Sequence, residues 1–343
     1  LVLLVLLGGC GSVPGSGSVE AERAGENAPP GLAAIERNAD EPLRVVATTN
    51  ILADVVAQVS GDKIELVGLV PTGADPHSFE PRPQDLIELN RAHVIFVNGL
   101  GLEEGLEPIL DSLDGGGVTL SVNDGVEPLA MADHNDDHGD EDDHGDEDDH
   151  SDEDDHATAH DEDGHGHEAG DPHTWFSVDA VKQWVVNIEQ ALSALDPENQ
   201  ATYAANAAAY RAELDALDAE LTAMVAPLPV ERRKLITDHD SFSYLADAYG
   251  FEVVGTISPS LSTLAAPSAA QLAVLLDQVE EEGVPALFVG TTVSPNLAEQ
   301  LANDAGIAVV TLYTGSLSDE SGPAENYLEL MRYNMGVITD ALQ

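Results

Sequence analysis

A charged, histidine-rich tract is the feature that most limits how this chain can fold. Within it, near-copies of Gly-Asp-Glu-Asp-Asp-His repeat a histidine every six residues. A stretch with so few apolar residues cannot bury enough surface to offset the entropy lost on ordering. We therefore expect residues 133–170 to form a disordered loop, and the fold to be built from the chain on either side. The histidines of the tract are His134, His138, His144, His150, His156, His160, His165 and His167.

Disorder does not prevent this tract from meeting metal ions. Neutral imidazole and carboxylate are ligands of divalent first-row metals, and a His/Asp-rich composition is typical of metal-binding segments. We interpret the tract as a low-affinity metal loop. The whole chain carries a formal charge of -52. Such an acidic balance argues against nucleic acid or anionic lipid as a partner.

The N-terminus predicts export and a lipid anchor. Residues 1–7 are purely apolar and lead into Gly8-Gly9-Cys10. A run of this kind is a signal-peptide core and is too short to span a bilayer. Residues 1–9 are interpreted as part of a signal peptide, and Cys10 resembles the lipidated cysteine of a bacterial lipobox. Residues 10–42, rich in Gly, Pro, Ser, Ala and Glu, are expected to be a flexible tether.

Cys10 is the only cysteine of the chain, so neither an intrachain disulfide nor a thiolate metal site is expected. The remaining length exceeds one comfortable core and predicts two lobes. Short β-branched runs alternate with helical spacing on both sides of the acidic tract, and this alternation predicts parallel α/β sheets. The expected strands of the first lobe are 43–49, 64–70, 93–97 and 118–122, and those of the second lobe are 234–237, 252–256, 286–289 and 309–312.

Two histidines stand at predicted strand ends, where parallel sheets place their ligands. His77 lies in the proline-rich loop after the second strand, and His239 follows the first strand of the second lobe. His93 starts a strand among apolar neighbours and is interpreted as structural. The glycines of 99–105 miss the spacing of a dinucleotide-binding fingerprint, so nucleotide binding is not expected.

Three ordered segments resemble one known family. They are Pro76-His77-Ser78-Phe79-Glu80-Pro81-Arg82-Pro83-Gln84-Asp85, Asp171-Pro172-His173-Thr174-Trp175 and Thr237-Asp238-His239-Asp240-Ser241-Phe242. With the lipobox and the histidine-rich insertion, the chain from Leu43 to Gln343 resembles the zinc/manganese-binding solute-binding lipoproteins of metal-importing ABC transporters. The resemblance implies two doubly wound parallel-sheet lobes, 43–196 and 227–343, joined by one long helix at 197–226. It also implies a metal site in the cleft between the lobes, with His77, His173 and His239 as ligands.

The chain departs from the family pattern at the fourth ligand. Gly315 stands where relatives commonly carry a ligating aspartate, and Gly290 stands where they often carry an acid. Either water or an acid such as Asp319 or Glu320 completes the coordination, or the site has three protein ligands and binds more weakly than usual; we favour water. Three imidazoles and one oxygen suit tetrahedral Zn²⁺ better than Mn²⁺, which prefers more and harder oxygen ligands.

Aspartates beside the ligands, Asp171 and Asp240, could orient them from outside, although helix capping or simple solvation explains them equally well. The function that these features imply is capture of extracytoplasmic zinc by a monomer and its delivery to an ABC permease. A surface adhesin or metal buffer without a transport role is the alternative. A zinc hydrolase is disfavoured, because the sequence contains neither an HExxH helix nor a GxSxG elbow.

Overall fold

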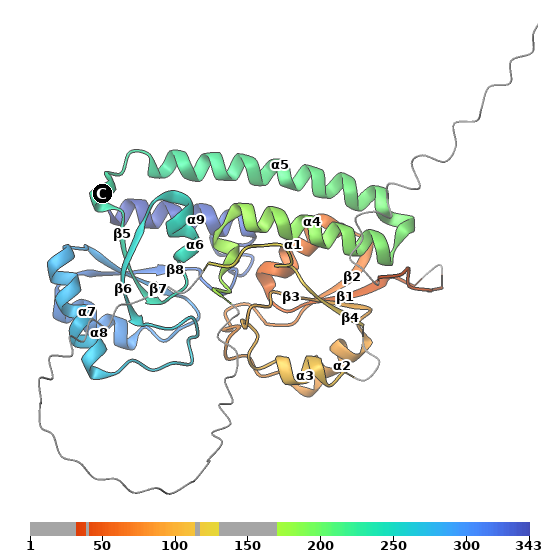
Figure 1. The fold of residues 1–343 in the computed structure, drawn as a ribbon, viewed down its shortest axis with the longest axis horizontal. Coiled ribbons are helices and arrows are strands. Elements are labelled where there is room, and N and C mark those ends of the chain that lie inside the picture. The colour runs from red at the N-terminus through yellow and green to blue at the C-terminus, as the bar shows by residue number, and fades with distance from the viewer. Residues whose placement is uncertain (1–31, 39–40, 114–116, 130–169) are drawn as a thin grey trace, which may run out of the picture.

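The computed structural model describes residues 32–38, 41–113, 117–129 and 170–343. The expected signal peptide, Cys10 and the eight histidines of the acidic tract lie outside these ranges. Within them, the chain forms two α/β lobes that lie side by side and share a layer of long helices (Figure 1).

The first lobe is built on a parallel sheet with the strand order β2-β1-β3-β4. Alternate residues of its central strands face opposite sides. Val45 and Phe96 contact the core beneath α1 and α4, whereas Val46 and Ile95 contact a second core with Leu89 of α2. Both faces are therefore covered, as parallel sheets require. The elements are β1 (Leu43–Ala47), α1 (Asn50–Ser60), β2 (Ile64–Gly68), α2 (Pro83–Arg91), β3 (Val94–Val97), α3 (Glu107–Asp111) and β4 (Val118–Ser121).

The second lobe repeats this architecture with the order β6-β5-β7-β8, again parallel throughout. Leu235 and Phe288 join the core shared with the long helices, and Ile236 and Leu287 face α7 and α8 on the other side. The elements are β5 (Lys234–His239), α6 (Ser243–Tyr249), β6 (Glu252–Ser258), α7 (Ala269–Glu282), β7 (Ala286–Gly290), α8 (Asn296–Ala305) and β8 (Ala308–Leu312).

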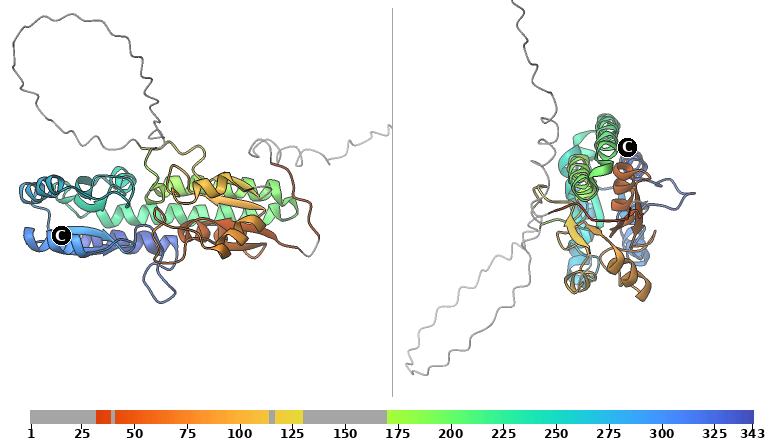
Figure 2. Two further views of the ribbon diagram at one scale, coloured as in Figure 1. Left: turned by 90° about the horizontal axis from the view of Figure 1, so that it is seen from below. Right: turned by 90° about the vertical axis from the view of Figure 1, so that its right-hand side faces the viewer.

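Three long helices hold the lobes together: α4 (Val178–Leu195), α5 (Gln200–Val225) and α9 (Tyr327–Ala341). Helix α5 runs along the edge of both lobes, over α4 and α1 in the first and over α9 in the second (Figures 1 and 2). It therefore provides the expected long joining helix. Short 3₁₀ turns complete the described elements: η1 (Thr174–Phe176), η2 (Pro197–Asn199) and η3 (Val230–Arg232).

The predicted strands are all present, with ends that shift by a few residues. β5 extends to His239 itself, so this histidine belongs to the strand rather than to the following loop. The short helix α3 was not predicted, because its five residues are too few to show helical periodicity. The exact limits of the two lobes in sequence stay a prediction.

Candidate metal centre

Three histidines from distant parts of the chain meet between the lobes. His77 comes from the loop after β2, His173 from the residue before η1, and His239 from the carboxyl end of β5. Their side chains are buried, with exposed fractions of 3%, 1% and 4%. Each offers a ring nitrogen to a group whose atoms all lie within 4.8 Å of one another. The structure thus brings together the three ligands that the family resemblance implies.

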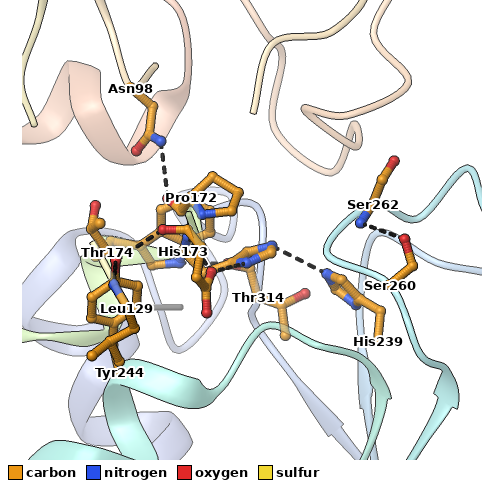
Figure 3. A network of polar contacts seen from close by, with 12 residues as sticks. Asn98, Leu129, Pro172, His173, Thr174, His239, Tyr244, Ser260, Ser262 and Thr314 are labelled. Carbon is orange, nitrogen blue, oxygen red and sulfur yellow. Dashed lines mark hydrogen bonds and ion pairs between the residues drawn. The ribbon is translucent and has the colours of Figure 1, made fainter. Parts of the chain in front are cut away.

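The spacing of the nitrogens fits a metal ion. His173 Nε2 lies 3.2 Å from His77 Nε2 and 3.3 Å from His239 Nε2, and Figure 3 shows His173 and His239 facing each other. Zn–N bonds of about 2.0–2.1 Å at tetrahedral angles place two nitrogens about 3.3–3.4 Å apart. An octahedral ion has longer bonds and right angles between them, and it places two ligand nitrogens nearly the same distance apart. The distances support a metal site without choosing the ion.

Local hydrogen bonds explain how the loops aim these rings. Asp75 Oδ1 accepts from the backbone N–H of His77 at 3.1 Å, and Asp75 Oδ2 accepts from Ser78 Oγ at 3.1 Å. These contacts form a tight turn that directs the imidazole inward. The segment before η1 is fixed from both lobes. The amide of Asn98 donates to Pro172 O at 2.9 Å, and the hydroxyl of Tyr244 donates to Asp171 O at 2.9 Å (Figure 3).

Two aspartates set the orientation of two rings. Asp171 Oδ1 lies 2.8 Å from His173 Nδ1, and Asp238 Oδ1 lies 3.0 Å from His239 Nδ1. A carboxylate can only accept, so each Nδ1 carries the proton and each Nε2 presents a lone pair to the centre. Asp238 is itself held, because its Oδ2 accepts from the backbone N–H of Gly290 at 2.9 Å.

Burial and neighbouring charges act differently on the three imidazoles. Burial, with repulsion from the other two histidines, lowers the pKa of His77 to about 2. Burial also lowers the pKa of His173, against the opposing effect of Asp171. At His239 burial again acts to lower the pKa, but the hydrogen bond and charge of Asp238 outweigh it, and the pKa is raised. Burial therefore favours the neutral form of His77 and His173, whereas Asp238 favours the protonated form of His239, where a metal competes with a proton.

The two glycines at the fourth ligand position have definite surroundings. A Cβ on Gly315 would lie 2.9 Å from Cδ of Pro76, so the backbone at 315 approaches the other lobe too closely for a side chain. A Cβ on Gly290 would lie 2.1 Å from Thr314 Oγ1, so Thr314 and Asp238 occupy the space that a side chain at 290 would need. The surrounding side chains therefore leave no room for a ligand side chain at either position.

The remaining predicted site residues lie at different distances from the centre. Asp171 is buried, and its Oδ1 lies 2.8 Å from His173 Nδ1. The backbone N–H of Asp240 donates to Ser260 O at 3.0 Å. Asp319 and Glu320 are exposed, the Asp319 carboxylate accepts hydrogen bonds from Ser321, and neither acid belongs to the group of converging ligand atoms. The sequence reasoning missed Asp238. Its signal was a carboxylate directly before a strand-end histidine, comparable with Asp171 before His173.

His93 and the glycine-rich turn at 99–101 are not expected to bind metal or nucleotide, and both have structural roles. His93 Nδ1 accepts from the backbone N–H of Arg44 at 2.9 Å and lies outside the metal centre. The glycine-rich turn at 99–101 is held by the buried carboxylate of Glu103, which accepts from the backbone N–H groups of Asn98 and Gly99.

Comparison with known proteins agrees with this architecture. The sequence model of the family described as zinc-uptake complex component A, periplasmic, matches residues 45–341. A manganese-binding lipoprotein of Halalkalibacterium halodurans is 29% identical over 303 residues, 88% of this chain and 89% of that protein.

Two solved structures resemble the fold. The periplasmic zinc-binding protein TroA of Treponema pallidum has a TM-score of 0.72 at 26% identity, with 88% of this chain and 99% of that one covered. The manganese-bound periplasmic metal-binding protein of Candidatus Liberibacter asiaticus has a TM-score of 0.71 at 25% identity, with coverages of 87% and 99%.

Two α/β lobes with a buried histidine triad between them define a metal-binding solute-binding protein. The chain belongs to the family of the periplasmic zinc-uptake component A, the substrate-binding components of metal ABC transporters. It is not an enzyme, and it acts outside the cytoplasm, as its relatives do. Among the helices of the described ranges, none has the length and apolar character needed to cross a membrane.

Proposed function

We propose that this protein captures Zn²⁺ and delivers it to the permease of an ABC importer. The observation that carries the proposal is the donor set. Three imidazole nitrogens converge, and no carboxylate of the described residues belongs to the same group. Borderline-soft Zn²⁺ favours such a set, whereas Mn²⁺ favours harder oxygen donors. The relatives are named for manganese or zinc, so the family alone does not choose the ion.

We further propose that water supplies the fourth ligand. A space of about 10 Å³ lies against the three histidines and is also lined by Thr314 and Gly315. A volume of this size holds about one water molecule. Thr314 Oγ1 is buried and makes no hydrogen bond within the described part of the chain, so a water bound here would give it a partner. Asp319 is a weaker candidate because its carboxylate is engaged with Ser321 on an exposed loop.

The test is a competitive titration of Zn²⁺ and Mn²⁺ against a calibrated chelator, on protein lacking residues 133–168. One tight zinc equivalent is expected, which manganese does not displace. His77→Ala and His239→Ala should each remove it, because two imidazoles cannot hold the ion as tightly as three. His93→Ala is the matched control and should leave zinc binding unchanged. Tighter binding of manganese than of zinc would contradict the proposed cargo.

The histidine-rich tract and the N-terminus complete the proposed organisation. We propose that residues 133–170 act as a low-affinity antenna or sensor for zinc, and that a lipid on Cys10 anchors the protein through the tether 10–42. The intact chain should then bind additional zinc weakly, and removing the tract should leave the tight site intact. Loss of the tightest site on deletion would mean that the tract, rather than the triad, holds the ion.

A further inference from the structure

Two cavities meet at the metal centre from the side of the second lobe. The larger, which we name the vestibule, has a volume of about 190 Å³ and lies at the carboxyl ends of β5, β6 and β7 beside the start of α8. Its rim includes the exposed Ser294, and its depth reaches the buried Ile257 and Val289. The smaller space is the one of about 10 Å³ against the histidine triad. Only His239 and Thr263 line both spaces, so these two side chains form the wall between them.

Thr263 is bonded across the interlobe boundary. Its hydroxyl donates to Asp75 Oδ2 at 2.5 Å, and Asp75 Oδ1 accepts from the backbone N–H of His77. The same carboxylate therefore positions a ligand of the first lobe and holds the wall of the second. Hydrogen bonds to charged acceptors are the stronger ones, so this contact favours the closed position of the Thr263 loop.

That loop connects β6 to α7 and runs beside His239, where Figure 3 shows Ser260 and Ser262. Its internal contacts are short-range: Ser262 N–H donates to Ser260 Oγ at 3.1 Å, and Ser258 Oγ donates to Ala265 O at 3.0 Å. Thr263 itself contributes little to either hydrophobic core, since it is only partly buried. Ser260 O also accepts from the backbone N–H of Asp240 at 3.0 Å, which fixes the start of the loop, whereas Thr263 further along is held to the first lobe through Asp75.

The volumes of the two spaces indicate how much water can accompany a cation on each side of Thr263 and His239. On the measure by which about 10–15 Å³ admits one water, the vestibule admits more than a dozen, which is room for a divalent cation with most of its hydration shell. The space at the triad holds about one. An ion that passes from one to the other must exchange its waters for imidazoles at the boundary that Thr263 and His239 form.

We propose that the vestibule is the route by which the cation reaches and leaves the histidine triad, and that the Thr263–Asp75 hydrogen bond is its gate. The proposal rests on the proposed function, because it needs metal to bind at the triad. It makes Thr263 a positioning residue that controls the rate of exchange while contributing no ligand atom.

The experiment measures zinc dissociation by stopped flow, with the full-length chain loaded with half an equivalent of Zn²⁺ and mixed with excess fluorescent chelator. Thr263→Val removes the hydroxyl and keeps the shape of the side chain, and it should speed dissociation about tenfold. Ser294→Ala is the matched control, since this residue lines the vestibule but makes no bond to Asp75, and its rate should equal that of the native chain.

A second variant blocks the route without touching the gate. Ser294→Trp places a bulky side chain at the exposed rim, where folding tolerates it, and should slow association and dissociation by similar factors while the dissociation constant stays unchanged. Native rates in both Thr263→Val and Ser294→Trp would overturn the gate while leaving zinc capture in place. Absence of tight zinc binding in the native chain would overturn the proposed function, and the gate with it.

Discussion

At the scale of single residues, one oxygen atom fixes each of two ligands. Asp238 Oδ1 contacts both the backbone N–H of His239, at 2.9 Å, and its ring Nδ1, at 3.0 Å. Asp171 Oδ1 does the same for His173, at 2.9 and 2.8 Å. A single acceptor that binds main chain and ring together leaves the imidazole one orientation. Nε2 is thereby aimed at the metal before the metal arrives.

This arrangement predicts the effect of Asp238→Asn. The amide keeps the size of the side chain but removes the charge, so it no longer favours a protonated Nδ1 or strengthens the ring as a donor. We expect zinc affinity to fall about 10- to 100-fold in a chelator competition, with some loss of thermal stability because one amide oxygen cannot accept from both His239 and Gly290. Asp247→Asn, an exposed position on α6, should bind zinc like the native chain. Equal affinities in the two variants would exclude the orienting role of Asp238.

The imidazoles also predict how stability depends on pH without metal. The pKa of His77 lies far below its unfolded value and that of His173 is lowered too, so the unfolded chain binds protons that the folded chain does not as the pH falls below about 6.5. Stability contributed by His77 is present above that pH and is lost on acidification. From pH 6.5 to 5 the loss is about 2 kcal/mol for this group. The raised pKa of His239 acts in the opposite sense, at higher pH.

Urea unfolding of metal-free protein at pH 7 and pH 5 measures this dependence. His77→Gln should show a loss smaller by about 2 kcal/mol, because the titrating group is gone. His93→Gln is the control, because it removes a half-buried histidine that lies outside the triad. An unchanged loss in His77→Gln would show that His77 does not resist protonation in the folded state.

At the scale of elements, α5 joins the two lobes through one buried stripe. Its inward residues recur at spacings of three and four, which aligns them on one face. Leu214 lies at the middle of this stripe and is fully buried. We expect Leu214→Ala to lower the free energy of unfolding by about 2–5 kcal/mol in urea denaturation. Glu213→Ala, one residue away on the exposed face, should change it by less than about 0.5 kcal/mol. Equal effects would mean that α5 does not depend on this stripe.

Helices and strands could be predicted from the sequence because the spacing of their apolar residues is visible within one short segment. The β-branched run at 43–49 predicts β1, and the apolar spacing at Ile51, Leu52, Val55, Val56 and Val59 predicts α1 with Asn50 as its cap. The helix is present, but Thr49 is its N-cap and Asn50 its first residue, because the Thr49 side chain accepts from the backbone N–H of Leu52. Contacts between distant segments carry no periodic signal. The bond from the Asn50 amide to Ser316 Oγ, which also accepts from Gly73 N–H, joins the two lobes and could not be read from either segment alone.

The same distinction applies to the metal centre. Its three ligands were accessible because each sits in a motif that resembles the family, whereas the close approach of the Gly315 backbone to Pro76 depends on three-dimensional packing. The resemblance identified Gly315 as an absent ligand. Only the structure shows why this backbone leaves no room for an aspartate there.

At the scale of the whole molecule, the metal centre is divided between the lobes. His77 lies in the loop after β2 of the first lobe, His173 directly precedes η1, and His239 ends β5 of the second sheet. An ion bound by all three links the lobes directly, in addition to the hydrogen bonds that already cross between them. The bound state should then be more stable by RT ln(1 + [L]/Kd), about 4 kcal/mol at a thousandfold excess of free ligand over Kd.

That linkage predicts a zinc-dependent rise in thermal stability that needs both lobes. For protein lacking residues 133–168, in which the histidines of the tract cannot bind zinc in the unfolded state, we expect the midpoint to rise on the order of 10 °C with excess Zn²⁺, followed by circular dichroism. His239→Ala should lose most of the rise, because the second lobe then offers no ligand, whereas His93→Ala should keep it. A full rise in His239→Ala would mean that the first lobe holds the ion alone, and the cleft would then have to close by contacts other than the metal.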